Sequence, residues 1–401
     1  MGHGARFALV ASVLLAGCVT TPPAAVVAPG SEDYLALLAR FPSPNAAVGP
    51  DSHGPEGEQP MTHGLVLGAE ALRLRAHPAA SSERFATSAW ALVNGSDADA
   101  SGIRGWGLPF AWDFFGDGVL TRPGAAMAVY SGIAIQGLLD AIPILPETAG
   151  ALPARADAAE AVASTCTGFA RSAFTAGNGT GWFWYSEIPE DATFVANAAS
   201  YLAGSCRRAL AETPGSFAPA DAALVEDRVD ATVRHVLATS RDGRPSWSYD
   251  APRPHEPNDI VHQAYIVHGL ETYRASGGRV PLPWDRATLT GTLAPFWVGG
   301  DLREYSPEDG ADVPATLVDR PARLWGVGMA LGTQACWGKS ADAERLVAEL
   351  KARYGPWPNL TLYPRSYAED GAFYGRHSAH VLWGLAALEF APGTCAVRKG
   401  I

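Results

Sequence analysis

The sequence predicts an all-α fold built from six helical hairpins. Periodic apolar segments alternate with loops rich in Gly and Pro, whereas the strict apolar/polar alternation of strands is scarce. Every second segment also shares one texture: small residues, an aromatic or polar residue, and then glycine. Twelve helices are expected, at residues 31–41, 62–78, 82–95, 123–143, 156–176, 191–212, 219–240, 257–276, 284–297, 316–337, 340–354 and 376–391.

The glycine that closes each of these alternate segments recurs at a long, regular spacing. Consecutive closing glycines lie 69, 67, 65, 63 and 52 residues apart, and they are Gly68, Gly137, Gly204, Gly269, Gly332 and Gly384. Self-similarity of this kind is typical of repeat architectures. Because glycine inside a helix costs about 1 kcal/mol relative to alanine, its recurrence indicates inner helices that pack closely. The partner segments, such as 157–174 and 221–237, carry Asp, Glu and Arg on one face and are expected to be outer, amphipathic helices.

Twelve helices in six repeats resemble the (α/α)6 toroid, the six-hairpin fold of many carbohydrate-active enzymes. A repeat near 65 residues is long for the common helical solenoids, and six units fit ring closure, so a toroid is favoured over an open solenoid. The resemblance is architectural and covers nearly all of the chain after residue 30. The families that it resembles are six-hairpin glycosidases, toroidal polysaccharide lyases and the C-terminal domain of glucuronyl C5-epimerases.

The first residues predict export. Arg6 precedes an apolar run over residues 7–16, which is too short for a membrane-spanning helix and typical of a cleaved signal peptide. The run ends in Leu-Ala-Gly-Cys at residues 15–18, which resembles a bacterial lipobox and implies lipidation of Cys18. A plain secretory signal with an accidental cysteine is the alternative.

Three regions follow from this interpretation. Residues 1–17 would be the signal peptide, 18–30 the lipidated cysteine and a flexible tether rich in Thr, Pro, Ala and Val, and 31–401 a single toroid domain. The protein is then expected to lie outside the cytoplasm, in the periplasm or at the cell surface, anchored to the cell membrane or the outer membrane. The net charge of −11 argues against a nucleic-acid partner, and no protein partner is implied.

The remaining cysteines predict disulfides rather than a metal site. They are far apart and form no CxxC pair, so a zinc knuckle is not expected. Outside the cytoplasm disulfides are stable, and the pairs Cys166–Cys206 and Cys336–Cys395 would each join helices that the repeat makes neighbours. His377 and His380 have no acid at metal-like spacing, and no GxGxxG, Walker or GxSxG motif occurs in the required context. Neither a metal nor a cofactor is therefore expected.

The loops that lead into the inner helices carry one repeated chemistry. In a closed ring these loops gather at one mouth, and five successive ones combine aromatic rings with charged groups. Sugars need this mixture, because their C–H faces pack on Trp and Tyr rings while their hydroxyls need polar partners. The helix N-termini there would also favour an anionic sugar. The candidate binding residues are Trp106, Trp112, Trp182, Trp184, Tyr185, Trp247, Tyr249, Arg303, Tyr305, Arg365 and Tyr367, with His262 and His380 near the starts of inner helices.

Three functions compete at this site. A glycoside hydrolase would use a pair of carboxyl groups, with Asp113 or Asp117 on one side and Glu187 or Glu304 on the other; Asp113 is the first candidate. A uronate lyase or C5-epimerase would abstract the C5 proton with a Tyr or His and neutralise the uronate with Arg, and the residues available are Tyr249, Tyr305, Tyr367, His262, Arg303 and Arg365. A non-catalytic glycan-binding lipoprotein is the third.

Several candidates also have a purely structural interpretation. Trp182, Trp184 and Trp247 are suited to plugging one end of a ring. Asp191 and Asp259 stand at expected first turns of helices, where acids cap free backbone N–H groups. Loop carboxylates are abundant, so the sequence favours hydrolysis, while the Tyr and Arg clusters keep proton abstraction open.

Overall fold

The computed structural model describes residues 32–52, 54–95, 102–249, 257–307, 313–368, 371–393 and 395. Within them lie twelve α-helices in the predicted order. The inner helices are α2 (Pro60–Ala76), α4 (Ala128–Ala141), α6 (Ala196–Glu212), α8 (Ile260–Ala275), α10 (Leu324–Trp337) and α12 (Gly375–Phe390). The outer helices are α1 (Glu32–Leu38), α3 (Glu83–Asn94), α5 (Arg155–Ser172), α7 (Pro219–Ala238), α9 (Arg286–Gly291) and α11 (Ser340–Arg353).

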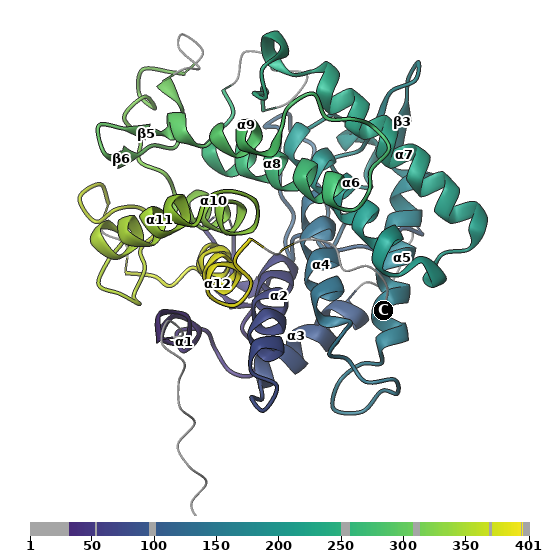
Figure 1. The fold of residues 1–401 in the computed structure, drawn as a ribbon, viewed down its shortest axis with the longest axis horizontal. Coiled ribbons are helices and arrows are strands. Elements are labelled where there is room, and N and C mark those ends of the chain that lie inside the picture. Colours follow the sequence, from purple (N-terminus) through teal and green to yellow (C-terminus); the bar gives the residue numbers. More distant parts are fainter. Residues whose placement is uncertain are drawn as a thin grey trace, which may run out of the picture.

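The six inner helices form a closed ring. Each packs against the next in the series α2, α4, α6, α8, α10 and α12, and the last packs against the first. Figure 1 shows this closure, with the yellow α12 beside the purple α2 although they stand at opposite ends of the chain. The predicted all-α toroid is confirmed, and the open solenoid is excluded.

Burial follows the division into two rings. The inner helix α10 buries all but one of its residues, whereas the outer helix α11 buries only Ala343, Leu346, Glu349 and Leu350. A helix surrounded by other helices must be apolar on every side, and one at the surface only along a stripe. The residue pattern that distinguishes alternate segments of the sequence therefore indicates whether a helix belongs to the inner or the outer ring.

Glycines hold alternate pairs of inner helices backbone to backbone. A Cβ atom on Gly137 of α4 would lie 2.3 Å from a backbone oxygen of α2, and one on Gly204 of α6 would lie 2.3 Å from the backbone oxygen of Gly269 on α8. On α10, a Cβ on Gly328 would lie 2.5 Å from a backbone nitrogen of α12. The prediction of close packing is confirmed for Gly137, Gly204, Gly269 and Gly384, in the pairs α2–α4, α6–α8 and α10–α12. It is not confirmed for Gly68, where an added Cβ would meet only ordinary contacts of 3.4 Å or more.

Short antiparallel β-hairpins lie in the loops that connect the helices. β1 (Val48–Gly49) pairs with β2 (Gly57–Glu58), β3 (Phe174–Ala176) with β4 (Gly181–Phe183), and β5 (Trp297–Val298) with β6 (Asp301–Leu302). The helix expected from residue 316 begins only at Leu324. Pro321, which lacks an N–H and disfavours a helical residue before it, instead stands in a β-bridge with Arg303.

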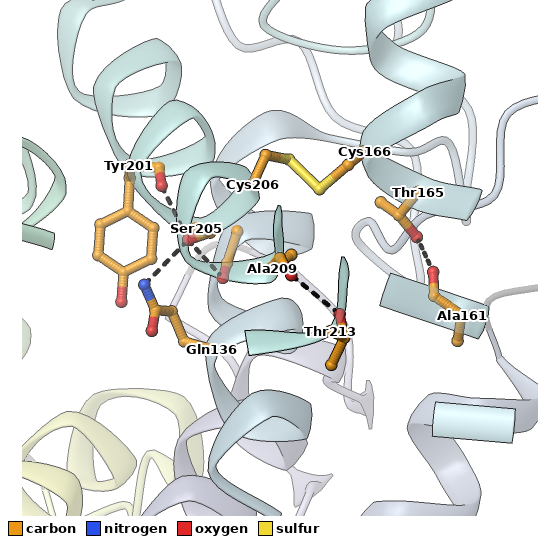
Figure 2. The surroundings of a disulfide bond; sticks show 10 residues. Gln136, Ala161, Thr165, Cys166, Tyr201, Ser205, Cys206, Ala209 and Thr213 are labelled. Atoms are coloured by element: carbon orange, nitrogen blue, oxygen red, sulfur yellow. Dashed lines mark hydrogen bonds between the residues drawn. A yellow bond between two sulfur atoms is a disulfide. The ribbon is translucent and has the colours of Figure 1, made fainter. Parts of the chain in front are cut away.

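Both predicted disulfides are present. Cys166 on the outer helix α5 is bonded to Cys206 on the inner helix α6, and Cys336 on α10 is bonded to Cys395. Figure 2 shows the first of them beside Ser205, whose hydroxyl accepts a hydrogen bond from Gln136 of α4 at 3.2 Å. This part of the ring is thus tied both to its outer layer and to the next inner helix.

The predicted signal peptide, Cys18 and tether lie outside the described residues, so lipidation and the domain boundaries stay predictions. In the part of the chain that is described, no helix is long and apolar enough to cross a membrane. Asp250, His255, Glu256, Glu369 and Asp370, which belong to the predicted mouth loops, also lie outside the described residues.

Candidate active site

A cavity of about 190 Å³, here called the central pocket, opens where the inner helices begin. Every inner helix contributes a side chain from its first turn, and these are Met61, Tyr130, Asn197, His262, Trp325 and Arg376. The positive ends of six helix dipoles therefore lie around one cavity, which favours a ligand with negative charge.

Aromatic rings from the mouth loops complete the wall. Trp112, Phe114, Tyr185 and Tyr249 line the pocket. The rings of Phe114 and Tyr185 pack edge to face with centroids 5.0 Å apart, and those of Tyr249 and His262 with centroids 4.7 Å apart. The wall thus offers both the flat apolar surfaces and the polar edges that a sugar ring requires.

Two guanidinium groups face the pocket, and the carboxylates that hold them do not. Arg376 is ion-paired with the buried Asp51 (Nε to Oδ2 2.8 Å), donates to the Tyr130 hydroxyl at 3.0 Å, and lies 4.9 Å from the centre of the Trp325 ring. Arg323 also lines the cavity. Neither Asp51 nor the two carboxylates beside Arg323 line it, so the arginines are the charged groups that the described residues present on the pocket wall.

Arg323 belongs to a buried network of charges. Its Nε lies 2.7 Å from Glu304 Oε1, and the Nε of Arg320 lies 2.7 Å from Glu304 Oε2. Arg323 also reaches Asp259 (Nη2 to Oδ2 3.4 Å). Burial raises the pKa of Glu304 despite the arginines beside it. Burial opposes ionisation of Asp259 as well, but His262 and Arg323 outweigh it and lower the pKa of that carboxyl.

Asp259 orients His262. One carboxylate oxygen, Oδ1, lies 2.8 Å from His262 Nδ1 and also accepts the backbone N–H of His262 at 2.9 Å, which makes Asp259 the N-cap of α8 as predicted. The negative charge of Asp259 beside Nδ1 favours this orientation of the ring. His262 therefore stands on the pocket wall with a carboxylate at one edge of its ring.

A second relay runs away from the pocket. Trp325 Nε1–H donates to the Tyr265 hydroxyl at 2.9 Å, and that hydroxyl lies 2.6 Å from His380 Nε2. His380 Nδ1 lies 2.8 Å from the carbonyl oxygen of Arg376, which can only accept, so Nδ1 carries the proton and Nε2 accepts from Tyr265. Burial lowers the pKa of His380 to about 3, which keeps this ring neutral.

Only part of the predicted aromatic wall faces the pocket. Trp112, Tyr185, Tyr249 and His262 line it, and His380 lies behind it. The remaining tryptophans pack elsewhere. Trp182 packs against the His235 ring, and Trp184 donates to Thr175 Oγ1 at 2.8 Å.

Trp106 and Trp247 are buried in the core, with their indole N–H groups bonded to backbone oxygens of α3 and α7. Structural packing therefore accounts for both side chains.

Each of the four predicted catalytic carboxylates has its own set of partners. Asp113 accepts backbone N–H groups from Gly116 (2.7 Å), Asp117 (3.2 Å) and Gly118 (2.9 Å), and these bonds lower its pKa. Asp117 is exposed and accepts the N–H of Val119. Both acids organise the tip of the loop that carries Trp112, and their catalytic roles stay predictions.

Glu187 is buried against Arg122, and Glu304 lies behind Arg323. Among the described residues, no Asp or Glu lines the central pocket.

The remaining predicted residues lie away from the pocket wall. Tyr305 bridges to Asp259 through the backbone, and burial raises the pKa of its hydroxyl. Arg303 pairs with Asp301 and Asp319. Arg365 is exposed, and the half-exposed Tyr367 packs at a tilt against the Tyr363 ring. In the described part of the chain no group of three or more His, Cys, Asp or Glu is placed to hold a metal ion.

The ring of six hairpins with an aromatic, polar pocket at one mouth defines the class of (α/α)6 toroids that includes the six-hairpin glycosidases. No protein-family model matches the sequence. No curated protein matches it either.

Solved structures with this fold do match. A reducing-end-xylose releasing exo-oligoxylanase complexed with xylose aligns with a TM-score of 0.54 at 10% identity, over 92% of this chain and 94% of its own. An α-amylase from Clostridium perfringens aligns with a TM-score of 0.52 at 11% identity, over 86% and 90%. A cold-adapted family 8 xylanase aligns with a TM-score of 0.52 at 12% identity, over 88% and 84%. These likenesses establish a glycoside hydrolase-like fold.

Proposed function

We propose that this protein is a carbohydrate-active enzyme that binds an anionic saccharide in the central pocket and acts on it by proton abstraction next to a sugar carboxylate. The observation that carries the proposal is the composition of the wall: two arginines, an asparagine, tyrosines and a carboxylate-held histidine, with no carboxylate among the described lining residues. The described residues of that wall include no carboxylate pair for hydrolysis, whereas they do include groups that can bind and polarise a uronate.

The chemistry follows from the positions of these groups. The C5 proton of a uronate is acidified when the neighbouring carboxylate is neutralised, and Arg323, Arg376 and Asn197 are the groups available for this. His262 or the adjacent Tyr249 takes the C5 proton. The electron pair of the broken C5–H bond then forms the C4–C5 double bond while the C4–oxygen bond breaks, and the leaving oxygen takes up a proton from the protonated base or from water, which completes the elimination. Return of a proton to the opposite face of C5 without cleavage is epimerisation.

Incubation with polyuronates and neutral polysaccharides tests the proposal. Elimination produces ultraviolet absorbance from unsaturated uronates, and epimerisation produces exchange of the C5 proton with solvent deuterium. The substitutions His262→Gln and Tyr249→Phe should lower kcat by about 10²–10⁴-fold. His235→Gln is the matched control, because His235 packs against Trp182 outside the pocket. If no uronate substrate gives either ultraviolet absorbance or exchange of the C5 proton, proton abstraction is refuted.

Glycoside hydrolysis is the second candidate, supported by the fold of the xylanases and the amylase and by the acids of the mouth loops. It would produce new reducing ends without ultraviolet absorbance. Asp113→Asn should then abolish activity if Asp113 is the catalytic acid. Binding of saccharides without any turnover would instead support the non-catalytic alternative.

We also propose that the protein is an exported lipoprotein tethered through Cys18, in the cell membrane or the outer membrane. The lipobox-like sequence supports this, and so do two disulfides, which persist in oxidising compartments. Metabolic labelling with a radioactive fatty acid tests it: wild type should be labelled and recovered with membranes, whereas Cys18→Ser should lose the label. A labelled Cys18→Ser protein would contradict the assignment.

A further inference from the structure

A second cavity, here called the outer cavity, lies beside the central pocket and shares no lining residue with it. It has a volume of about 300 Å³, at the lower end of the roughly 300–1,000 Å³ of small-molecule sites. Its wall is formed by the turn after α7, the start of α8 and the end of α9. The neighbouring residues His262 and Gln263 of α8 face the two different cavities, since successive helical side chains diverge by about 100°.

The wall of the outer cavity is polar and preorganised. Gln263 is only 4% exposed, and its Nε2 donates to the carbonyl oxygen of Pro245 and to Thr292 Oγ1, both at 2.9 Å. Asn258 is 3% exposed; its side-chain oxygen has no hydrogen-bond partner, and its Nδ2 lies 3.4 Å from Gln263 Oε1. A buried polar atom without a partner is costly, so a ligand that donates a hydrogen bond would relieve it.

The charged side chains on the described wall of the outer cavity are arginines. Arg241 and Arg244 line the cavity, and no Asp or Glu among the described residues does so, although the chain carries a net charge of −11. Arg241 is held in place by two bonds to Ser248 Oγ, at 3.2 and 3.0 Å. The acid beside Arg244 is Asp242, an exposed side chain 3.4 Å away that does not line the cavity.

We infer that the outer cavity is a second binding site for an anionic sugar unit. Arg241 and Arg244 hold the carboxylate, because guanidinium groups match the geometry of planar oxyanions. The sugar hydroxyls donate hydrogen bonds to the side-chain oxygens of Asn258, Gln263 and Thr292. A bare inorganic anion cannot donate these hydrogen bonds. The inference rests on the proposed function for its ligand class, since both cavities then take the same kind of sugar.

Calorimetric titration of the purified protein with sodium glucuronate tests the inference. Wild type is expected to show two classes of sites, and Tyr249→Ala removes the one in the central pocket. Arg244→Gln should weaken glucuronate binding at the outer cavity about tenfold or more, because it removes a charge-assisted hydrogen bond. Arg244 is exposed, so the substitution is not expected to disturb the fold. Gly291→Phe should block it sterically, because a Cβ at Gly291 meets nothing within 4 Å and its ring would enter the cavity.

Asp242→Asn is the matched control. It removes the acid beside Arg244 without altering the cavity wall, so glucuronate should bind at least as tightly as to wild type. Glucose and inorganic phosphate serve as comparison ligands, and both should bind the outer cavity more weakly than glucuronate does.

Two results would overturn the inference. The first is an outer class of sites that survives in both Arg244→Gln and Gly291→Phe, or that is absent from wild type. The second is binding of glucose or phosphate as tight as that of glucuronate. Turnover of polyuronates, measured on the same wild-type protein, reports on the proposed function separately, because it depends on His262 and Tyr249 in the central pocket.

Discussion

Replacing Gly204 by alanine should destabilise the ring at the α6–α8 contact. An added Cβ would lie 2.3 Å from the Gly269 carbonyl oxygen and 3.0 Å from the Gly269 carbonyl carbon and Cα. All three atoms are backbone, so no side-chain rotation relieves the overlap. Since a carbon–oxygen contact needs more than 3 Å, the two helices must separate by about 1 Å.

The magnitude is a balance of two terms. Overpacking in a core costs about 1–3 kcal/mol, and a backbone-to-backbone overlap belongs at the upper end of that range. Alanine is about 1 kcal/mol better than glycine in a helix interior. Gly204→Ala should therefore lower the free energy of unfolding by about 2 kcal/mol. In urea unfolding this appears as a lower midpoint with an unchanged slope.

The control is Gly291→Ala, also helical, where the Cβ meets nothing within 4 Å. It should be neutral or stabilise by up to about 1 kcal/mol. Gly204→Ala should also impair the site, because Asn197 and His262 each stand seven residues upstream of the paired glycines, about 10 Å along the axis. A 1 Å misplacement can cost about 10²-fold in rate. A Gly204→Ala protein as stable as Gly291→Ala would refute this account of the ring.

Three further predictions follow from single contacts. Removing the disulfide with Cys166→Ala and Cys206→Ala, which opens a 40-residue loop, should cost about 4 kcal/mol on the chain-entropy estimate, measured by guanidinium unfolding. Burial raises the pKa of Glu389 to about 7, so the free energy of unfolding of the wild type falls as pH rises from about 4.5 to about 7. The loss is on the order of 1–2 kcal/mol after allowance for solvent screening. Unfolding measured across this pH range should show that Glu389→Gln abolishes it. Asp259→Asn should keep the helix cap but lower kcat about 10²-fold or more, because His262 loses the negative charge beside its Nδ1. An unchanged kcat would show that Asp259 does not assist His262 in the reaction.

The ring could be predicted from the sequence because one residue type recurs at the same place in every repeat. In most repeats this glycine allows close contact with the neighbouring inner helix, and its long period revealed six units. The helix boundaries were less predictable near Pro321, where a β-bridge with Arg303 replaces the first turns expected for α10. Such pairing depends on a distant segment, and local propensity carries no information about it.

The pocket wall had a signal in the sequence that is clear only once the ring is known. Met61, Tyr130, Asn197, His262 and Trp325 each precede the closing glycine of their helix by seven residues. Seven residues are close to two helical turns of 3.6, so the glycine and the pocket residue lie on the same face. The glycine lies where the neighbouring inner helix is close. Two turns earlier in the sequence, the same face of the helix lies at the mouth of the ring and lines the central pocket.

The mouth loops were harder to interpret because an extended segment has two faces. Trp182 and Trp184 lie on one side of their strand, and Phe183 and Tyr185 lie on the other, in keeping with the period of two. Alternation in the sequence separates these two sets but does not say which set points inward. That choice depends on His235 of α7, whose ring packs against Trp182 and retains it outside the pocket.

The acids show why the count of carboxylates pointed toward hydrolysis. Glu304, Asp259 and Asp51 are buried behind the wall, where they hold Arg323 and Arg376 in place. A buried arginine needs such a partner, since an unpaired charge there would cost several kcal/mol. These carboxylates therefore position cations. The cations are the charged groups among the described residues that reach the cavity, and they are the reason for proposing an anionic sugar as its ligand in a chain whose net charge is −11.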